Sequence, residues 1–119
     1  LPFIEASTDI AALDTTYSVP GLIFTVFPGA DGDIAGTIAN FAPAAGECTT
    51  DNGLADYDDG LFAGQYGYWS GCGGGAAETV VLVAVPADGS YTAVLGVQIL
   101  SDADWAALDQ AFATFNFVG

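Results

Sequence analysis

Acidic residues gather in the segment DNGLADYDDG, which covers residues 51 to 60. Asp56, Asp58 and Asp59 are candidates for a metal site, because calcium prefers clustered carboxylate and carbonyl oxygens. A carboxylate pair could instead cleave glycosidic bonds, a reaction that needs two acids, one of them with a raised pKa. An EF-hand loop that began at Asp56 would require an acid where the chain has Gly67. The alternative is a surface loop whose carboxylates are solvated and screened by diffuse counterions. Calcium is the only cofactor that the sequence suggests.

Aromatic residues lie within and just beyond the same acidic segment. Tyr57, Tyr66, Tyr68 and Trp69 are separated by glycines and small residues. Glycine neighbours leave aromatic rings uncovered, and exposed aromatic rings are common in binding surfaces. We therefore predict a shallow binding face formed by these four side chains, with packing in the core over a disulfide as the alternative.

Cys48 and Cys72 are the two cysteines of the chain and enclose a loop of intermediate length. A single disulfide is the simplest interpretation, and it would stabilise the fold by about 3 kcal/mol in the chain-entropy model. A zinc site would need further cysteines or histidines, which the chain lacks. No cation is present to lower a thiol pKa, so a nucleophilic cysteine is not expected. The disulfide predicts a secreted, extracellular protein.

The charge of the chain has one sign. It contains 15 acidic residues and no Lys, Arg or His, so its formal net charge is −15. Without these residues the Ser-His-Asp triad, the Ser-Lys dyad and Schiff-base chemistry are excluded, and we do not expect an enzyme. Binding to nucleic acids or anionic membranes is also excluded, because both require basic side chains at phosphates. Repulsion between copies predicts a monomer.

The missing basic residues need an explanation in themselves. Average composition would give on the order of 14 Lys and Arg in a chain of this length. Natural selection and deliberate engineering both remain open as causes. Mutual repulsion should raise carboxylate pKa values in the folded state, so stability should be greater near about pH 4 to 5 than near pH 8.

Length and hydrophobicity predict one folded domain over residues 1–119. Hydrophobic residues make up 52% of the chain, which argues against disorder. No apolar run approaches the length of a membrane span, and LPFIEASTDI at the N-terminus lacks the features of a signal peptide. The chain, which contains no Met, is expected to be excised from a longer secreted protein.

Hydrophobic periodicity predicts an α+β domain. The antiparallel hairpin of TVVLVAV and YTAVLGVQIL is the strongest signal, because two β-branched runs flank a short turn that contains glycine. A loop is expected around Cys48. The remaining elements are helices over residues 7–18, about 33–41 and 101–115, and strands over 21–27 and 61–70. Together they favour an antiparallel sheet flanked by helices.

Two stretches resemble a known family: CTTDNGLADYDDGLFAGQYGYWSGCGG and VVLVAVPADGSYTAVLGVQILSDADWAALDQAFATF. They are similar to a domain at the C-terminal end of secreted bacterial trypsin-like serine proteases, which has a PsbP-like fold. The resemblance implies a noncatalytic accessory domain whose partner is the parent protease domain or another extracellular protein. It departs from the family at Gly89, where relatives carry a basic residue, and in lacking an upstream strand pair.

Three functional hypotheses follow from the sequence. The first is a secreted, noncatalytic accessory or binding domain associated with a serine protease. The second is a calcium-dependent binding module or a small carboxylate-based hydrolase. The third is a natural or engineered model domain without positive charges and without an activity of its own.

Overall fold

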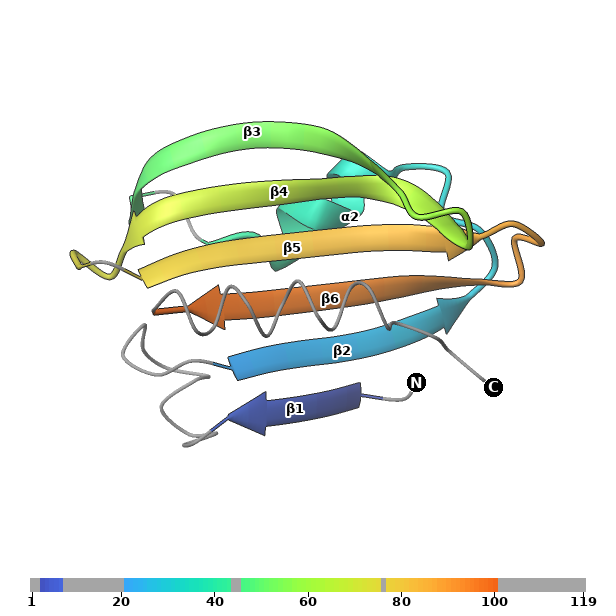
Figure 1. The fold of residues 1–119 in the computed structure, drawn as a ribbon, viewed down its shortest axis with the longest axis horizontal. Coiled ribbons are helices and arrows are strands. Elements are labelled where there is room, and N and C mark those ends of the chain that lie inside the picture. Colours follow the sequence, from blue (N-terminus) through green and yellow to red (C-terminus); the bar gives the residue numbers. More distant parts are fainter. Residues whose placement is uncertain (1–2, 8–20, 44–45, 76, 101–119) are drawn as a thin grey trace.

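A computed structural model of the chain describes residues 3–7, 21–43, 46–75 and 77–100. Within these ranges six strands form one antiparallel sheet in the order β1-β2-β6-β5-β4-β3, with one helix packed against it (Figure 1). The elements are β1 (Phe3–Ser7), β2 (Gly21–Pro28), α2 (Ile34–Phe41), β3 (Cys48–Asp58), β4 (Phe62–Cys72), β5 (Ala77–Pro86) and β6 (Tyr91–Ile99).

The predicted hairpin forms the centre of the sheet. β5 and β6 pair antiparallel, with Leu82 opposite Leu95 and Val83 opposite Val94. Val83 is fully buried, as expected for an apolar run with both faces covered. At the turn, Gly89 adopts a φ of 66° and its N–H donates to the carbonyl of Pro86 at 2.9 Å. The left-handed backbone is the reason that a glycine suits this position.

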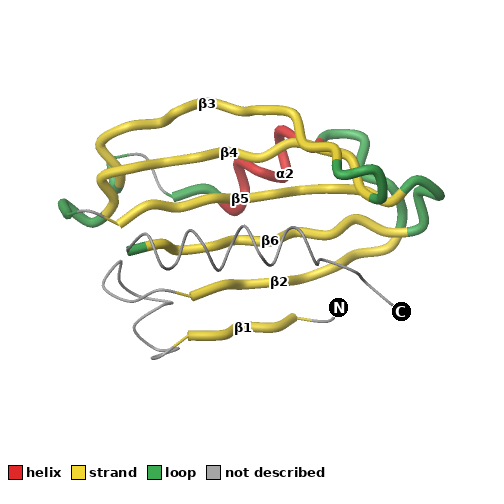
Figure 2. The backbone as a smooth tube through the Cα atoms, viewed as in Figure 1, coloured by secondary structure: helices red, strands yellow, loops and turns green. Residues whose placement is uncertain are grey.

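The sheet has two apolar faces, because alternate residues of a strand point to opposite sides. On one face α2 packs over β4 and β5, which lie in front of it in the view of Figures 1 and 2. Between α2 and this face lies the cluster of Ile38 from the helix and Trp69, Cys72, Ala77, Val81, Val83 and Val94 from the sheet. The opposite face carries Phe62, Val80, Leu82, Ala84, Leu95 and Ile99.

Helix α2 confirms the helix predicted over residues 33–41. Asp33 is its N-cap and accepts a hydrogen bond from the N–H of Gly36 at 3.1 Å. A Cβ at position 36 would lie 2.3 Å from a carboxylate oxygen of Asp33, so the capping side chain would have to shift if this residue were not glycine. Ile38 is almost completely buried and fixes the helix on the sheet.

Strand β3 replaces the loop that was predicted around Cys48. Its residues pair antiparallel with β4, with Cys48 directly opposite Cys72, and the pairing is interrupted by an irregularity between Asp51 and Leu54. The loop prediction is wrong because Asp, Asn and Gly disfavour strands locally, whereas pairing with β4 comes from a distant segment.

The predicted fold class, an α+β domain with an antiparallel sheet flanked by helices, is wrong. The described part is mostly antiparallel sheet and contains a single short helix, α2. The helices expected near the two ends lie outside the described residues, except Ser7, which ends β1. The strands predicted over 21–27 and 61–70 are confirmed as β2 and β4. In the described ranges, no helix has the length and hydrophobicity needed to cross a membrane.

Candidate functional site

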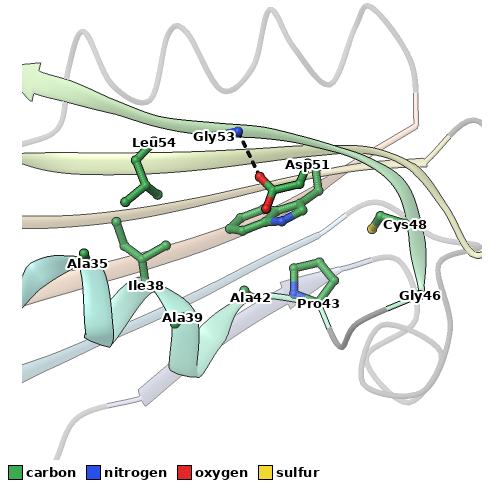
Figure 3. Close-up of a pocket in the computed structure, with 11 residues that line it drawn as sticks. Ala35, Ile38, Ala39, Ala42, Pro43, Gly46, Cys48, Asp51, Gly53 and Leu54 are labelled. Carbon is green, nitrogen blue, oxygen red and sulfur yellow. Dashed lines mark hydrogen bonds between the residues drawn. The ribbon is translucent and has the colours of Figure 1, made fainter.

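A groove of about 420 Å³ lies between helix α2 and strand β3 (Figure 3). We call it the α2–β3 groove. Volumes of a few hundred Å³ are typical of sites that receive a small ligand or a few side chains. Its lining is mainly apolar and comprises Ala35, Ile38, Ala39, Ala42, Pro43, Gly46, Cys48, Asp51, Gly53, Leu54 and Trp69.

Small residues keep this groove open. Ala35 and Ala39 on α2, and Ala42 directly after it, line the groove with methyl groups in place of larger side chains. On β4, the indole ring of Trp69 lies over Gly67, and a Cβ at position 67 would come within 2.5 Å of the ring. The glycine therefore lets the ring lie along the strand, where it forms part of the groove wall and is 9% exposed.

Leu54 is the exposed apolar side chain of the groove. It belongs to β3, pairs with Gly67 of β4, and is 47% exposed. In Figure 3 its side chain points toward Ile38 and Ala35 of α2 across the groove. Leu54 is continuous with the apolar wall of the groove, and a contiguous apolar surface of this kind, unlike a single exposed leucine, indicates a binding surface. The sequence reasoning missed this residue because it stands alone within an acidic run.

Asp51 brings a carboxylate to the α2–β3 groove. Its Oδ1 accepts a hydrogen bond from the N–H of Gly53 at 2.8 Å, drawn in Figure 3. Gly53 has a φ of 79°, so the turn at this irregularity of β3 depends on glycine. The groove thus combines apolar walls with one negative charge that is fixed in position.

The predicted metal ligands lie at the far end of β3 and in the following turn. Asp56 is exposed and pairs with Gln65 of β4. Asp58 accepts a hydrogen bond from the N–H of Gly60 at 2.9 Å. In the part of the chain that the structure describes, no group of three or more acidic or cysteine side chains is arranged to hold a metal ion. The calcium site remains a prediction.

Asp59 is the most strongly bonded of the predicted metal ligands. Its Oδ1 accepts hydrogen bonds from the N–H groups of Leu61 at 2.9 Å and Phe62 at 2.7 Å. Its Oδ2 accepts from the hydroxyl of Tyr57 at 2.7 Å. Partial burial alone would raise the pKa of Asp59, but the hydrogen bonds from Phe62, Tyr57 and Leu61 outweigh it and lower the pKa. The Asp59 carboxylate therefore stabilises the turn between β3 and β4.

Backbone N–H groups take the place of the missing cations elsewhere too. Asp31 accepts from the N–H of Asp33, and Asp88 accepts from the N–H and the hydroxyl of Ser90. The pKa of Asp88 is lowered by the Ser90 hydroxyl and then by the Ser90 N–H. The expected upward shift from mutual repulsion is therefore wrong for Asp59 and Asp88, because local hydrogen bonds favour the charged form.

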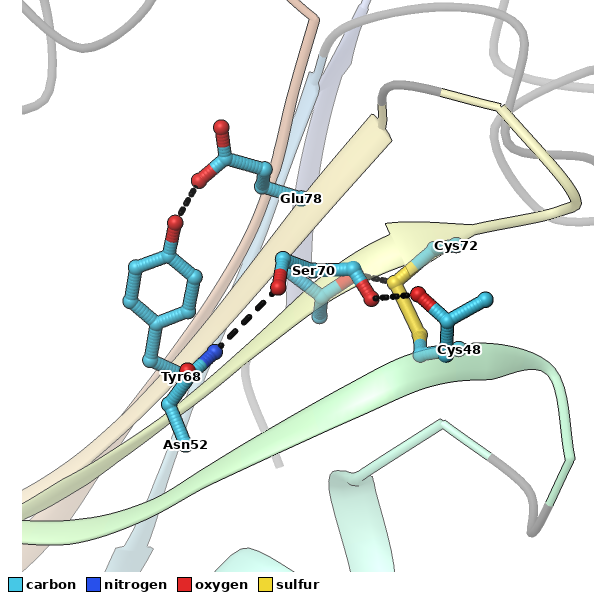
Figure 4. Close-up of a disulfide and its surroundings, with 8 residues drawn as sticks. Cys48, Asn52, Tyr68, Ser70, Cys72 and Glu78 are labelled. Atoms are coloured by element: carbon cyan, nitrogen blue, oxygen red, sulfur yellow. Dashed lines mark hydrogen bonds between the residues drawn. A yellow bond between two sulfur atoms is a disulfide. The ribbon is translucent and has the colours of Figure 1, made fainter.

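The four predicted binding-face aromatics lie on two faces of the sheet. Tyr57 and Tyr66 pack on the face opposite α2, whereas Trp69 belongs to the core beneath α2. Tyr68 pairs with Val80 and lies on the same face as Tyr57 and Tyr66. Its hydroxyl donates a hydrogen bond to Glu78 there (Figure 4). Consecutive residues of a strand point to opposite sides, so the adjacency of Tyr68 and Trp69 already contained this signal.

Two of these tyrosines have strongly raised pKa values. Burial, followed by the hydrogen bond to Asp59 and its negative charge, raises the pKa of Tyr57 to about 12. The hydrogen bond to Glu78, followed by burial and the charge of Glu78, raises the pKa of Tyr68 to about 12. Both phenols therefore remain protonated donors at neutral pH.

The disulfide between Cys48 and Cys72 confirms the predicted pairing. It joins directly opposite residues of β3 and β4, whose Cα atoms are 3.9 Å apart (Figure 4). Cys72 is almost completely buried in the cluster beneath α2. A disulfide in a domain of this size is compatible with an extracellular location.

Comparisons with protein-family models, with curated proteins and with solved structures give no match to this chain. The resemblance to C-terminal domains of secreted serine proteases therefore stays a prediction.

Proposed function

We propose that this chain is a noncatalytic binding domain that acts outside the cell and serves a partner protein through the α2–β3 groove. The observation that carries this proposal is the exposed side chain of Leu54 above an apolar hollow formed by α2 and Trp69. In the form suggested by the sequence resemblance, the domain is an accessory unit of a secreted serine protease.

The state of the acidic residues supports binding over hydrolysis. A glycosidase needs one carboxylic acid with a raised pKa, held ready as a proton donor. The pKa of Asp59 is lowered, and both of its oxygens accept hydrogen bonds. Asp58 also accepts a backbone hydrogen bond. Carboxylates held in this way suit turn formation better than proton transfer.

A selection of peptides from a random library displayed on phage, with the oxidised domain immobilised, tests the proposal. Bound sequences are then measured against two variants, Leu54→Ser in the groove and Leu61→Ser outside it. Both leucines are exposed, at 47% and 61%, so neither substitution removes a core contact. We expect the selected peptides to lose affinity for Leu54→Ser and to keep it for Leu61→Ser. Equal affinity for both variants would show that the groove is not the binding site.

A further inference from the structure

We propose that the outer edge of β3 binds an extended basic segment of another protein as an added strand, with one apolar side chain of that segment in the α2–β3 groove. This inference rests on the proposed function, because it assumes that the groove is the binding site. It adds the chemistry and the conformation of the partner.

The edge of β3 is long and accessible. β3 ends the strand order of the sheet and is paired with β4 alone among the described strands. Residues 49 to 56 are all exposed. An unpaired edge of this kind presents backbone N–H and C=O groups to a further strand, and peptides bind many domains in this way.

The side chains of β3 on the α2 side follow a definite order. Asp51 pairs with Trp69, and Leu54 pairs with Gly67, next to the groove. Asp56 and Asp58 continue on the same side, because alternate residues of a strand share a face. A strand added at this edge would therefore place an apolar residue beside Leu54 and basic residues beside the three aspartates, since opposite charges on neighbouring strands attract.

The charge of the chain selects the occupant. A second copy of this chain also carries a net charge of −15 and has no basic side chain to place beside these aspartates. Acidic segments are repelled for the same reason. A Lys- or Arg-rich segment is attracted over long distances by the negative field and gains local contacts at the edge. The charge of β3 therefore disfavours a second copy of this chain and favours a cationic partner.

The test uses a synthetic peptide whose pattern matches the edge in both strand directions, acetyl-Lys-Thr-Lys-Thr-Leu-Thr-Lys-Thr-Lys-amide. Isothermal titration calorimetry measures its affinity for the oxidised domain. A charge-reversed peptide has Glu in place of each Lys. Two further controls carry N-methyl groups on every second backbone amide, one control for each edge of the peptide, so that each can pair as a strand only through its unmodified edge. We expect binding of the first peptide, at least tenfold weaker binding of the N-methylated form whose modified edge would face β3, and no binding of the Glu peptide.

Variants of the domain locate the peptide. Leu54→Ser should weaken binding about tenfold, as expected for the loss of one buried leucine contact, and Leu61→Ser should not change it. Asp56→Asn should weaken binding about two- to threefold, as for an exposed ion pair. Glu78→Gln is the matched control, because it removes one charge from the opposite face and keeps an acceptor for Tyr68. We expect it to leave the affinity within the error of the wild type.

Different failures have different meanings. If the Lys peptide does not bind, or if both N-methylated forms bind as well as the unmodified Lys peptide, strand addition of a basic segment is overturned. The groove itself remains supported if library peptides still depend on Leu54. If the library peptides bind Leu54→Ser with unchanged affinity, the proposed function fails and this inference fails with it. Sedimentation that shows a dimer of the free domain, disrupted by Leu54→Ser, would make a second copy the occupant and would also overturn the proposal.

Discussion

Strands β3 and β5 flank the same strand, β4, yet they are held in place by opposite means. β5 is apolar and buried on both faces, with Val81 and Val83 almost inaccessible to solvent. β3 is polar and exposed over most of its length, and its sequence CTTDNGLADYD contains three aspartates. The disulfide holds one end of β3, and the Asp59 turn holds the other.

The difference shows that a strand in this sheet can be specified either by burial or by its two ends. Burial of apolar area, which is a non-directional contribution, stabilises β5 between its two neighbouring strands. In β3 the disulfide sets the register at Cys48, and hydrogen bonds from Leu61 and Phe62 to Asp59 set the return into β4. The middle of β3 is therefore not needed to hold the strand in place, and it carries the exposed Leu54.

Breaking the disulfide should have the largest effect on this arrangement. A loop closed over a sequence separation of 24 residues stabilises by about 3 kcal/mol in the chain-entropy model. Urea unfolding of the oxidised and the reduced protein measures the loss. Hydrogen exchange should show faster exchange of β3 amides, with β5 amides remaining the slowest. Equal unfolding midpoints would contradict the role of the disulfide in stability, and equal loss of protection in both strands would remove the contrast between them.

Shortening a buried side chain of β5 should have the next largest effect. Val83→Ala removes two methyl groups from the core and should lower the free energy of unfolding by about 2 kcal/mol. Thr50→Ala in the exposed part of β3 is the control and should change it by less than about 0.5 kcal/mol. Chemical denaturation of both variants gives the comparison. Similar losses would mean that β3 is held along its length and not at its ends.

Removing the Asp59 side chain should open the other end of β3. Asp59→Ala loses acceptors for Leu61, Phe62 and Tyr57, and we expect a loss of about 1 kcal/mol, whereas Asp56→Ala should be near neutral. The lowered pKa of Asp59 means that its contribution is present above the unfolded value and is lost as pH falls through the folded value. Unfolding measured across this acid range should show a weaker pH dependence in Asp59→Ala. An unchanged profile would argue against the turn.

The smallest effect concerns the tyrosines at alkaline pH. Folded pKa values near 12 for Tyr57 and Tyr68 lie above the ordinary value of 10.0. Their contribution to stability is therefore complete below pH 10 and is lost as pH rises through about 12. Ultraviolet titration of tyrosinate should show two late ionisations, one absent in Tyr57→Phe and one absent in Tyr68→Phe. Glu78→Gln should bring the Tyr68 pKa down, and an unmoved titration would mean that burial alone causes the shift.

Elements with strong local signals could be predicted from the sequence. The apolar runs of β2, β5 and β6 have a pattern that fits buried strands, and Asp33 marks the start of α2. β3 could not be predicted, because Asp51, Asn52 and Gly53 favour turns and their pairing partners lie in β4. The fold class was wrong because the described residues contain one short helix and are otherwise mostly strands, and counting β3 as a loop made the sheet look smaller.

The candidate site was predictable in part. The acids and aromatics of residues 51–69 lie in β3, β4 and the turn between them, and the Cys48–Cys72 pair was correct. The split between Tyr68 and Trp69 follows from strand alternation once β4 is placed. The α2–β3 groove could not be predicted, because it depends on how Leu54 of β3 and Ile38 of α2 face each other across the groove. No local sequence pattern encodes the position of α2 relative to β3.

The bonding of the carboxylates to backbone and hydroxyl donors also determines how the domain responds to ionic strength. Salt screens repulsion between exposed charges over roughly 10 Å at 0.1 M, but it weakens hydrogen bonds at contact distance far less. Most proteins also lose attractive ion pairs to this screening. With no Lys, Arg or His, this chain has no side-chain ion pairs to lose. Screening by added salt therefore acts on this fold in one direction, toward greater stability.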